Sequence, residues 1–101
     1  MSEAEEITVN VEFSGGMERL MKDQASSIQA KLPEPATIRD LIIHVRDNVV
    51  EDKKELFSKN DTVCPGILVI INGSDWEVED SEDTVLSNKD TVLFISTLHG
   101  G

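Results

Sequence analysis

The segment Thr97-Leu98-His99-Gly100-Gly101 has the residue types in this sequence that most clearly suggest chemistry. Glycine has no Cβ, so a Gly-Gly end can enter a narrow channel and bring an unhindered carboxylate to the reactive centre of another protein. A free carboxylate is a poor electrophile, but adenylation by ATP would convert it to a mixed anhydride that a thiolate or sulfide can attack. This end of the chain is therefore a candidate substrate for an activating enzyme. The alternative interpretation is a frayed tail or an expression scar.

The other nucleophilic or titratable residues have structural explanations. We interpret His99 as a recognition spacer, because no second catalytic residue lies near it in the sequence. His44 falls outside the apolar stripe of the expected helix, which indicates a surface or rim position. Cys64 is the single cysteine, so it cannot form an internal disulfide or build a zinc or iron–sulfur site alone. No basic sequence neighbour lowers its pKa, which favours a structural role. We predict no metal and no cofactor.

The charge balance excludes several classes of partner. Nine Lys and Arg against 20 Asp and Glu give the 101 residues a formal net charge of −11. Such a surface opposes binding to phosphate backbones and anionic lipid, so we expect no direct nucleic-acid partner and no membrane contact. The acidic run from Glu77 to Asp83 lacks the glycine and spacing of a calcium-binding loop. We interpret it as a solvated face that is complementary to basic partner surfaces.

The sequence predicts one domain over residues 1–101, with a disordered acidic start at 1–6 and a flexible tail at 97–101. The acidic start lacks the pattern of a signal peptide, and the longest apolar run, Ile67–Ile71, is too short to cross a bilayer. We found no nucleophile elbow and no phosphate-cradling glycine loop, so we do not expect an enzyme. We expect a soluble monomer in the cytoplasm, with the nucleus as a second candidate compartment.

The first half of the chain predicts a strand pair followed by a helix. Alternating apolar residues indicate a strand over 7–13, and Ser14 to Gly16 indicate a turn before a return strand over 26–32. Thr37 is expected to cap a helix that runs to Val50, with Asp40 as a weaker capping-box partner. The apolar residues of this helix form one stripe, which requires a sheet to cover.

The second half predicts the rest of the sheet. Residues 67–71 and 91–96 are apolar on both faces, as in central strands, and Asn72-Gly73 predicts a hairpin turn into a short edge strand over 76–78. This order predicts an α+β fold with one main helix on one face of a mixed sheet of about five strands. Right-handed crossover places the first and last strands side by side in the centre, which is a β-grasp arrangement.

The outer face of that sheet is a candidate partner surface. A single helix covers one face, so outward residues of the last strand, Leu93 and Ile95, are expected to form an exposed apolar patch. The alternative is that loops and side-chain stems cover this face.

The sequence resembles the family of ubiquitin-related modifiers, with a ubiquitin-like fold. The specific match is the ending from Val92 to Gly101, together with Pro65 to Glu77. Weaker agreement extends through Val11-Glu12-Phe13, Gly15-Gly16, Ile38 to Ile42 and Glu55-Leu56-Phe57. Residues 22–36 and Cys64 depart from the family pattern.

This resemblance implies a two-part function. An activating enzyme related to ubiquitin E1 would adenylate Gly101, recognising Thr97, Leu98, His99 and Gly100, and its sulfurtransferase part would convert the end to a thiocarboxylate. The sulfur would pass to a tRNA-thiolating enzyme complex that modifies wobble uridine, and the same activated end would join lysines of target proteins. Two alternatives are a bacterial-type sulfur carrier for cofactor biosynthesis and a ubiquitin-like binding module with an idle tail.

Overall fold

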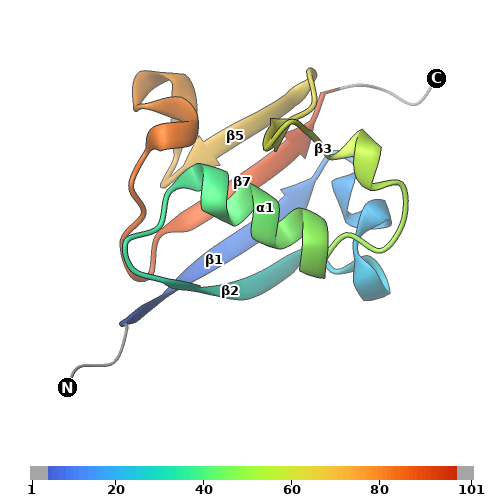
Figure 1. Cartoon of the computed structure of the whole chain (residues 1–101). Coiled ribbons are helices and arrows are strands. Elements are labelled where there is room, and N and C mark those ends of the chain that lie inside the picture. The colour runs from blue at the N-terminus through green and yellow to red at the C-terminus, as the bar shows by residue number, and fades with distance from the viewer. Residues whose placement is uncertain (1–4, 98–101) are drawn as a thin grey trace.

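Residues 5–97 of the computed structural model are described, and within them the chain forms a five-stranded mixed sheet with one α-helix on one face (Figure 1). The sheet order is β2-β1-β7-β5-β6. The central strands β1 (Glu6–Ser14) and β7 (Thr91–Ser96) are parallel, and the other pairs in this sheet are antiparallel. The α+β, ubiquitin-like β-grasp prediction is therefore confirmed, including the adjacent first and last strands.

The remaining elements connect this framework. The edge strands of the sheet are β2 (Ser27–Pro33) and β6 (Ser74–Asp75), and β5 (Ile67–Ile71) lies between β7 and β6. The helix is α1 (Ile38–Asn48). A small hairpin pairs β3 (Ser58–Lys59) with β4 (Thr62–Val63). Short 3-10 turns are η1 (Met17–Leu20), η2 (Lys22–Gln24), η3 (Lys54–Leu56), η4 (Trp76–Val78) and η5 (Ser81–Asp83). No helix within residues 5–97 is long and apolar enough to span a membrane.

The acidic start is shorter than predicted. Glu6 already pairs with Pro33 in the β1–β2 ladder, and the N–H of Glu34 donates to the carbonyl oxygen of Glu5 at 2.8 Å. The sheet extends this far because Pro33 lies on an edge strand, where a missing N–H is tolerated. Residues 1–4 of the predicted disordered start lie outside the described residues. The return strand itself lies within one residue of its predicted position.

The helix begins where the sequence predicts. The Thr37 hydroxyl accepts from the N–H of Asp40 at 3.3 Å, and the Asp40 carboxylate accepts from the N–H of Thr37 at 2.9 Å, which completes a capping box. Its buried stripe contains Ile38, Leu41, Ile42 and Val45. The helix ends at Asn48 rather than Val50, because Val50 is buried and forms a β-bridge with Met21.

The core between helix and sheet contains a group of three phenylalanines. The ring centroids of Phe57 and Phe94 lie 5.4 Å apart edge-to-face, and those of Phe13 and Phe94 lie 6.0 Å apart in a stack. Both arrangements are favourable for aromatic pairs. These two contacts pack β7 into the core at Phe94, three residues before Thr97.

The edge strand predicted over 76–78 is wrong. The Asn72-Gly73 turn is present, but β6 contains only Ser74–Asp75, and residues 76–78 form the turn η4. The cause is local, because the Asp75 carboxylate accepts from the N–H of Glu77 at 2.9 Å and caps this turn. The polar capping contact ends the strand before Trp76.

Candidate functional site

The candidate site begins at the end of β7, where the chain leaves the sheet. The N–H and the hydroxyl of Thr97 both donate to the carbonyl oxygen of Gly66, at 2.7 and 2.5 Å. Gly66 lies in the β4–β5 turn, directly before the pairing of Ile67 with Ser96, so these bonds extend the ladder by one residue. The prediction that the flexible tail starts at residue 97 is therefore wrong for Thr97, which is attached to the sheet.

Gly15, which follows β1, lies on the other side of the end of β7. The ladder between β1 and β7 ends with Ser14 opposite Ile95, and Gly15 follows with φ +70°. A Cβ on Gly15 would lie 2.4 Å from the carbonyl oxygen of Ser96, closer than real Cβ atoms approach backbone. We call Gly15 and Gly66 the collar: the backbone of Gly15 lies close to Ser96, and Gly66 accepts both hydrogen bonds from Thr97. Sequence reasoning missed this role, because Gly15 signalled only a turn.

The reactive end itself lies outside the described residues, which stop at Thr97. Leu98, His99, Gly100 and Gly101 therefore remain predictions as tail and attachment residues. The described structure shows how Thr97, the residue before them, is held by Gly66.

An apolar patch lies next to this base on the outer face of the sheet. Leu93 and Ile95 of β7 are half-buried. In the antiparallel ladder they lie opposite Ile70 and Leu68 of β5, respectively. Leu68 is the most open of the four, with 42% of its surface exposed. The sequence prediction named only the two β7 residues, although the two-sided apolar run of β5 carried the same signal. We call these four residues the outer patch.

The rest of the outer face is polar. On β1 and β2 the side chains of Asn10 and Gln29 lie across from each other, and the Gln29 amide donates to the Asn10 carbonyl at 3.2 Å. The outer patch is thus confined to the neighbouring strands β5 and β7. Apolar side chains of this kind, rimmed by polar residues, are typical of partner-binding surfaces.

Cys64 lies two residues before Gly66 and is half-buried. Its thiol donates to the carbonyl oxygen of Glu55 at 3.0 Å. Burial raises the pKa of the thiol, and this effect outweighs the opposing influence of Lys59, a basic residue that sequence proximity did not reveal. The thiol is therefore protonated at neutral pH and is a weak nucleophile.

In the acidic segment after β6, the carboxylate of Glu82 is held by a residue of the small hairpin. Glu82 accepts from the Thr62 hydroxyl at 2.5 Å, and this hydrogen bond lowers the pKa of Glu82 below its usual value. His44 is half-buried on α1, as expected of a residue at the rim of the helix stripe. Within residues 5–97, no group of three His, Cys, Asp or Glu side chains could hold a metal ion.

Comparisons with known proteins match this arrangement. The family model described as Urm1 (Ubiquitin related modifier) matches residues 8–101. "Ubiquitin-related modifier 1" of Homo sapiens is 47% identical over 98 residues, covering 94% of this chain and 96% of the relative. The Dictyostelium discoideum homologue is 45% identical, covering 92% and 98%.

Solved structures agree in fold. The solution structure of Urm1 from Trypanosoma brucei is 37% identical, has a TM-score of 0.79 and covers 100% of both chains. An Rurm1-related protein from Plasmodium yoelii, at 24% identity, has a TM-score of 0.83 and covers 93% of this chain and 100% of its own. The family match includes the Gly-Gly segment as well as the folded domain. The chain therefore belongs to the Urm1 family of ubiquitin-related modifiers.

Proposed function

We propose that this chain is a sulfur carrier for the 2-thiolation of wobble uridine in tRNA and also a protein modifier, activated at the carboxyl group of Gly101. The observation that carries the proposal is the family match, which runs through residue 101 and so includes the Gly-Gly segment. The collar supports it, since a fixed base gives the tail a defined starting direction.

The chemistry would take place in the partner enzyme. A carboxylate oxygen of Gly101 attacks the α-phosphorus of ATP and pyrophosphate leaves. The outer sulfur of a persulfide on the sulfurtransferase part of the activating enzyme then attacks the acyl carbon and displaces AMP, which gives an acyl disulfide. A second thiol of that enzyme attacks the enzyme-side sulfur, breaks the S–S bond and releases the thiocarboxylate, and the enzyme is left with a disulfide. In the modifier branch, the amine of a target lysine attacks the activated acyl carbon, loses a proton and forms an isopeptide bond as the leaving group departs. This chain contributes the tail and the docking surface and is not itself a catalyst.

The outer patch is the proposed docking surface for the activating enzyme. It lies on the half of the sheet from which the tail leaves, so a partner that holds the tail also reaches Leu68, Leu93 and Ile95. The acidic character of the chain fits a pathway in which the thiolating enzyme, rather than the carrier, holds the tRNA. With these partners, the compartment we propose is the cytoplasm, with the nucleus as a second candidate.

Intact mass measurement of the protein from its native cells tests the proposal most directly. A carrier is expected to show an oxygen-to-sulfur exchange at its C-terminus, and a modifier to give lysine-linked adducts in target peptides. Deletion of Gly101, or extension beyond it, should abolish activation by the purified activating enzyme and leave the thermal stability unchanged, because the buried core of the described residues runs from Ile7 to Phe94. Normal adenylation of either variant would reject the proposal. If the exchange occurs without conjugates or tRNA thiolation, the simpler cofactor-type carrier is correct.

A further inference from the structure

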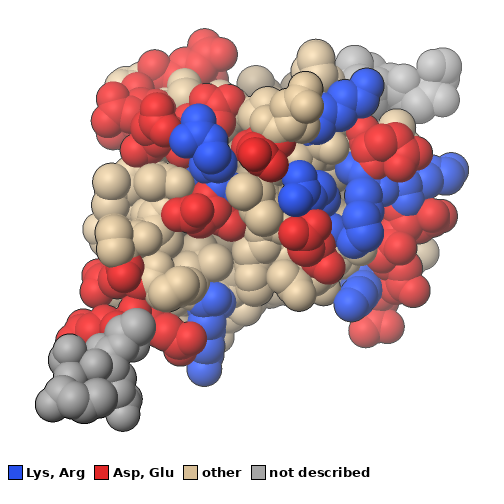
Figure 2. All heavy atoms as spheres, in the orientation of Figure 1, with Lys and Arg blue, Asp and Glu red and all other residues tan. Residues whose placement is uncertain are grey.

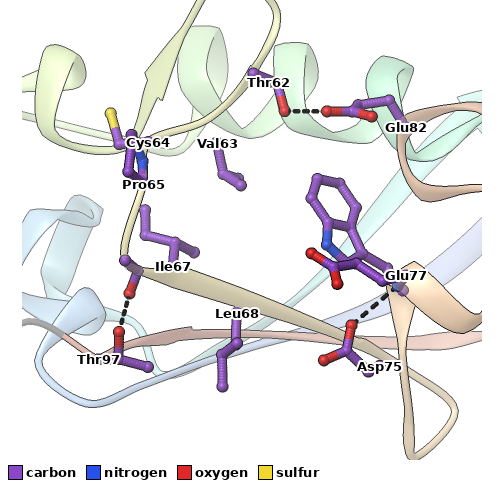
Figure 3. Close-up of a pocket in the computed structure, with 12 residues that line it drawn as sticks. Thr62, Val63, Cys64, Pro65, Ile67, Leu68, Asp75, Glu77, Glu82 and Thr97 are labelled. Atoms are coloured by element: carbon purple, nitrogen blue, oxygen red, sulfur yellow. Dashed lines mark hydrogen bonds between the residues drawn. The ribbon is translucent and has the colours of Figure 1, made fainter.

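A groove of about 430 Å³ opens beside Thr97, between the β4–β5 turn and the η4 segment (Figure 3). Its walls are largely apolar, and include Val63, Pro65, Ile67, Leu68 and Trp76. Leu68 belongs to both the groove and the outer patch, so the two surfaces are continuous. The groove therefore adjoins the surface that a partner must cover to hold the tail.

Three carboxylates line the groove, and they are Asp75, Glu77 and Glu82. Glu82 is partly engaged by the Thr62 hydroxyl, and Asp75 accepts the N–H of Glu77. The exposed carboxylate of Glu77 accepts no hydrogen bond from any residue between 5 and 97. Acceptor oxygens thus remain available for a donor that comes from outside the chain.

No lysine or arginine lines the groove, as far as residues 5–97 show. Arg39 approaches Glu82 from outside but is already paired with Asp83 at 2.6 Å, and Lys59 acts on Cys64 at the other end. Figure 2 shows that acidic side chains gather over the η4–η5 part of the surface. The groove is therefore a negative, partly apolar hollow without a neutralising charge of its own.

We propose that this groove binds an arginine side chain presented by the enzyme that activates the tail. The apolar walls suit the methylene stem of an arginine, and the indole of Trp76 suits the flat face of its guanidinium. The carboxylates accept the fixed fork of N–H donors, which a lysine ammonium does not offer. This inference rests on the proposed function for the identity of the partner, but the chemistry of the groove does not depend on it.

The groove has a built-in reporter, because Trp76 is the only tryptophan in the chain. The full chain is titrated with the blocked peptide acetyl-Ala-Arg-Ala-amide, while the tryptophan fluorescence is recorded. We expect a saturable change that weakens as salt is added, and no change with the citrulline peptide, which has the same shape without the charge. A third peptide has lysine in place of the arginine. If the citrulline or the lysine peptide gives the same response as the arginine peptide, or if the arginine peptide gives none, the groove is not an arginine site.

The second measurement uses the activating enzyme itself. Glu77→Gln is expected to raise the KM for this chain in ATP–pyrophosphate exchange about threefold, and Glu77→Lys at least about tenfold, with kcat unchanged. Glu34→Gln is the matched control, because Glu34 is exposed and follows β2, on the sheet edge opposite the groove. Unchanged KM values for both Glu77 variants would refute the groove site while leaving the proposed function intact. If the wild-type chain is not adenylated at all, the proposed function fails, and the peptide titration still decides the groove.

Discussion

Thr97 gives both its backbone N–H and its hydroxyl to a single acceptor, the carbonyl oxygen of Gly66, 31 residues earlier in the chain. The consequence is a tail that starts from a fixed point on the sheet rather than from a frayed strand end. Since a fixed base reduces the orientations that a tail samples, this contact should matter more for activation than for folding.

Thr97→Val separates these two effects. The substitution keeps the side-chain shape and the N–H bond but removes the hydroxyl donor. We expect the free energy of unfolding to fall by less than about 1 kcal/mol, because the site is exposed. The KM for adenylation should rise about two- to fivefold. Thr97→Ser keeps the hydroxyl and serves as the control. If Thr97→Val behaves as wild type in the adenylation assay, the hydroxyl does not position the tail.

Gly15 should tolerate no side chain. Gly15→Ala would place a Cβ 2.4 Å from the carbonyl oxygen of Ser96 at a φ of +70°, and we expect a loss of about 1–3 kcal/mol in the free energy of unfolding. Gly16→Ala is the matched control, because it has a φ of +95° but no atom within 4 Å of the added Cβ. Denaturant unfolding of both variants isolates the contact from the backbone strain. Equal losses would show that the contact with Ser96 contributes nothing.

The outer patch should affect binding without affecting folding. Leu68→Asp places a charge on a side chain that is 42% exposed, so the change in the free energy of unfolding should stay within about 1 kcal/mol. Binding to the activating enzyme should weaken about tenfold, because the carboxylate would be desolvated at the interface. Calorimetric titration with the purified enzyme measures this effect.

The control for the patch is Val85→Asp. Val85 is 64% exposed and lies outside the outer patch, so the same added charge should leave binding unchanged. An equal loss of affinity in both variants would point to net charge rather than to the patch. Normal affinity in Leu68→Asp would remove the patch from the interface.

The sequence predicted what depends on regular patterns. Alternating residues located the central strands, and Thr37 with Asp40 located the start of the helix, because each of these signals lies within a few neighbouring residues. Two of the four residues of the outer patch, Leu93 and Ile95, were named from the sequence. The signal was that a strand with apolar residues on both faces turns one of these faces away from the helix. Such patterns predict the structure well because the side-chain repeat of a strand or helix determines which of its residues are buried and which are exposed.

The missed features depend on contacts between distant residues or on local polar capping. In the collar, Gly66 accepts from Thr97 and Gly15 lies close to Ser96. The residues of each pair are far apart in the sequence, so no local pattern predicts that they meet. The turn over 76–78 has the apolar content of a strand, but the capping carboxylate of Asp75 decides its conformation. A side chain that competes for backbone donors can override strand propensity in this way.

Acid should weaken the link between the small hairpin and the η5 segment. The hydrogen bond from Thr62 lowers the pKa of Glu82 below its usual value of 4.5. Folding therefore favours the ionised form, and the stabilisation is complete above about pH 4.5 and is lost as the pH falls through the folded pKa. Thr62→Val should raise the pKa of Glu82, which an NMR titration of the Glu82 carboxyl carbon measures directly.

The unfolding data should agree with that titration. Thr62→Val should be less stable than wild type at neutral pH, and the difference should shrink as the pH falls below the folded pKa of Glu82. Thr62→Ser retains the hydroxyl and should follow the wild-type curve. A difference that stays constant down to the lowest pH would mean that Thr62 acts through packing rather than through the carboxylate.

Cys64 should react slowly although it lines the same groove as Thr97. Burial raises the pKa of its thiol above the usual value of 9.0, so the thiolate that attacks an alkylating reagent is scarce at neutral pH. We expect alkylation by iodoacetamide to be at least about tenfold slower in the folded chain than in denaturant, and its rate in the folded chain to keep rising with pH beyond 9. Cys64→Ser retains a donor for the carbonyl oxygen of Glu55 and should be adenylated normally. Equal alkylation rates in the folded and unfolded chains would contradict the buried, protonated thiol, and loss of adenylation in Cys64→Ser would give the cysteine a role that its geometry does not indicate.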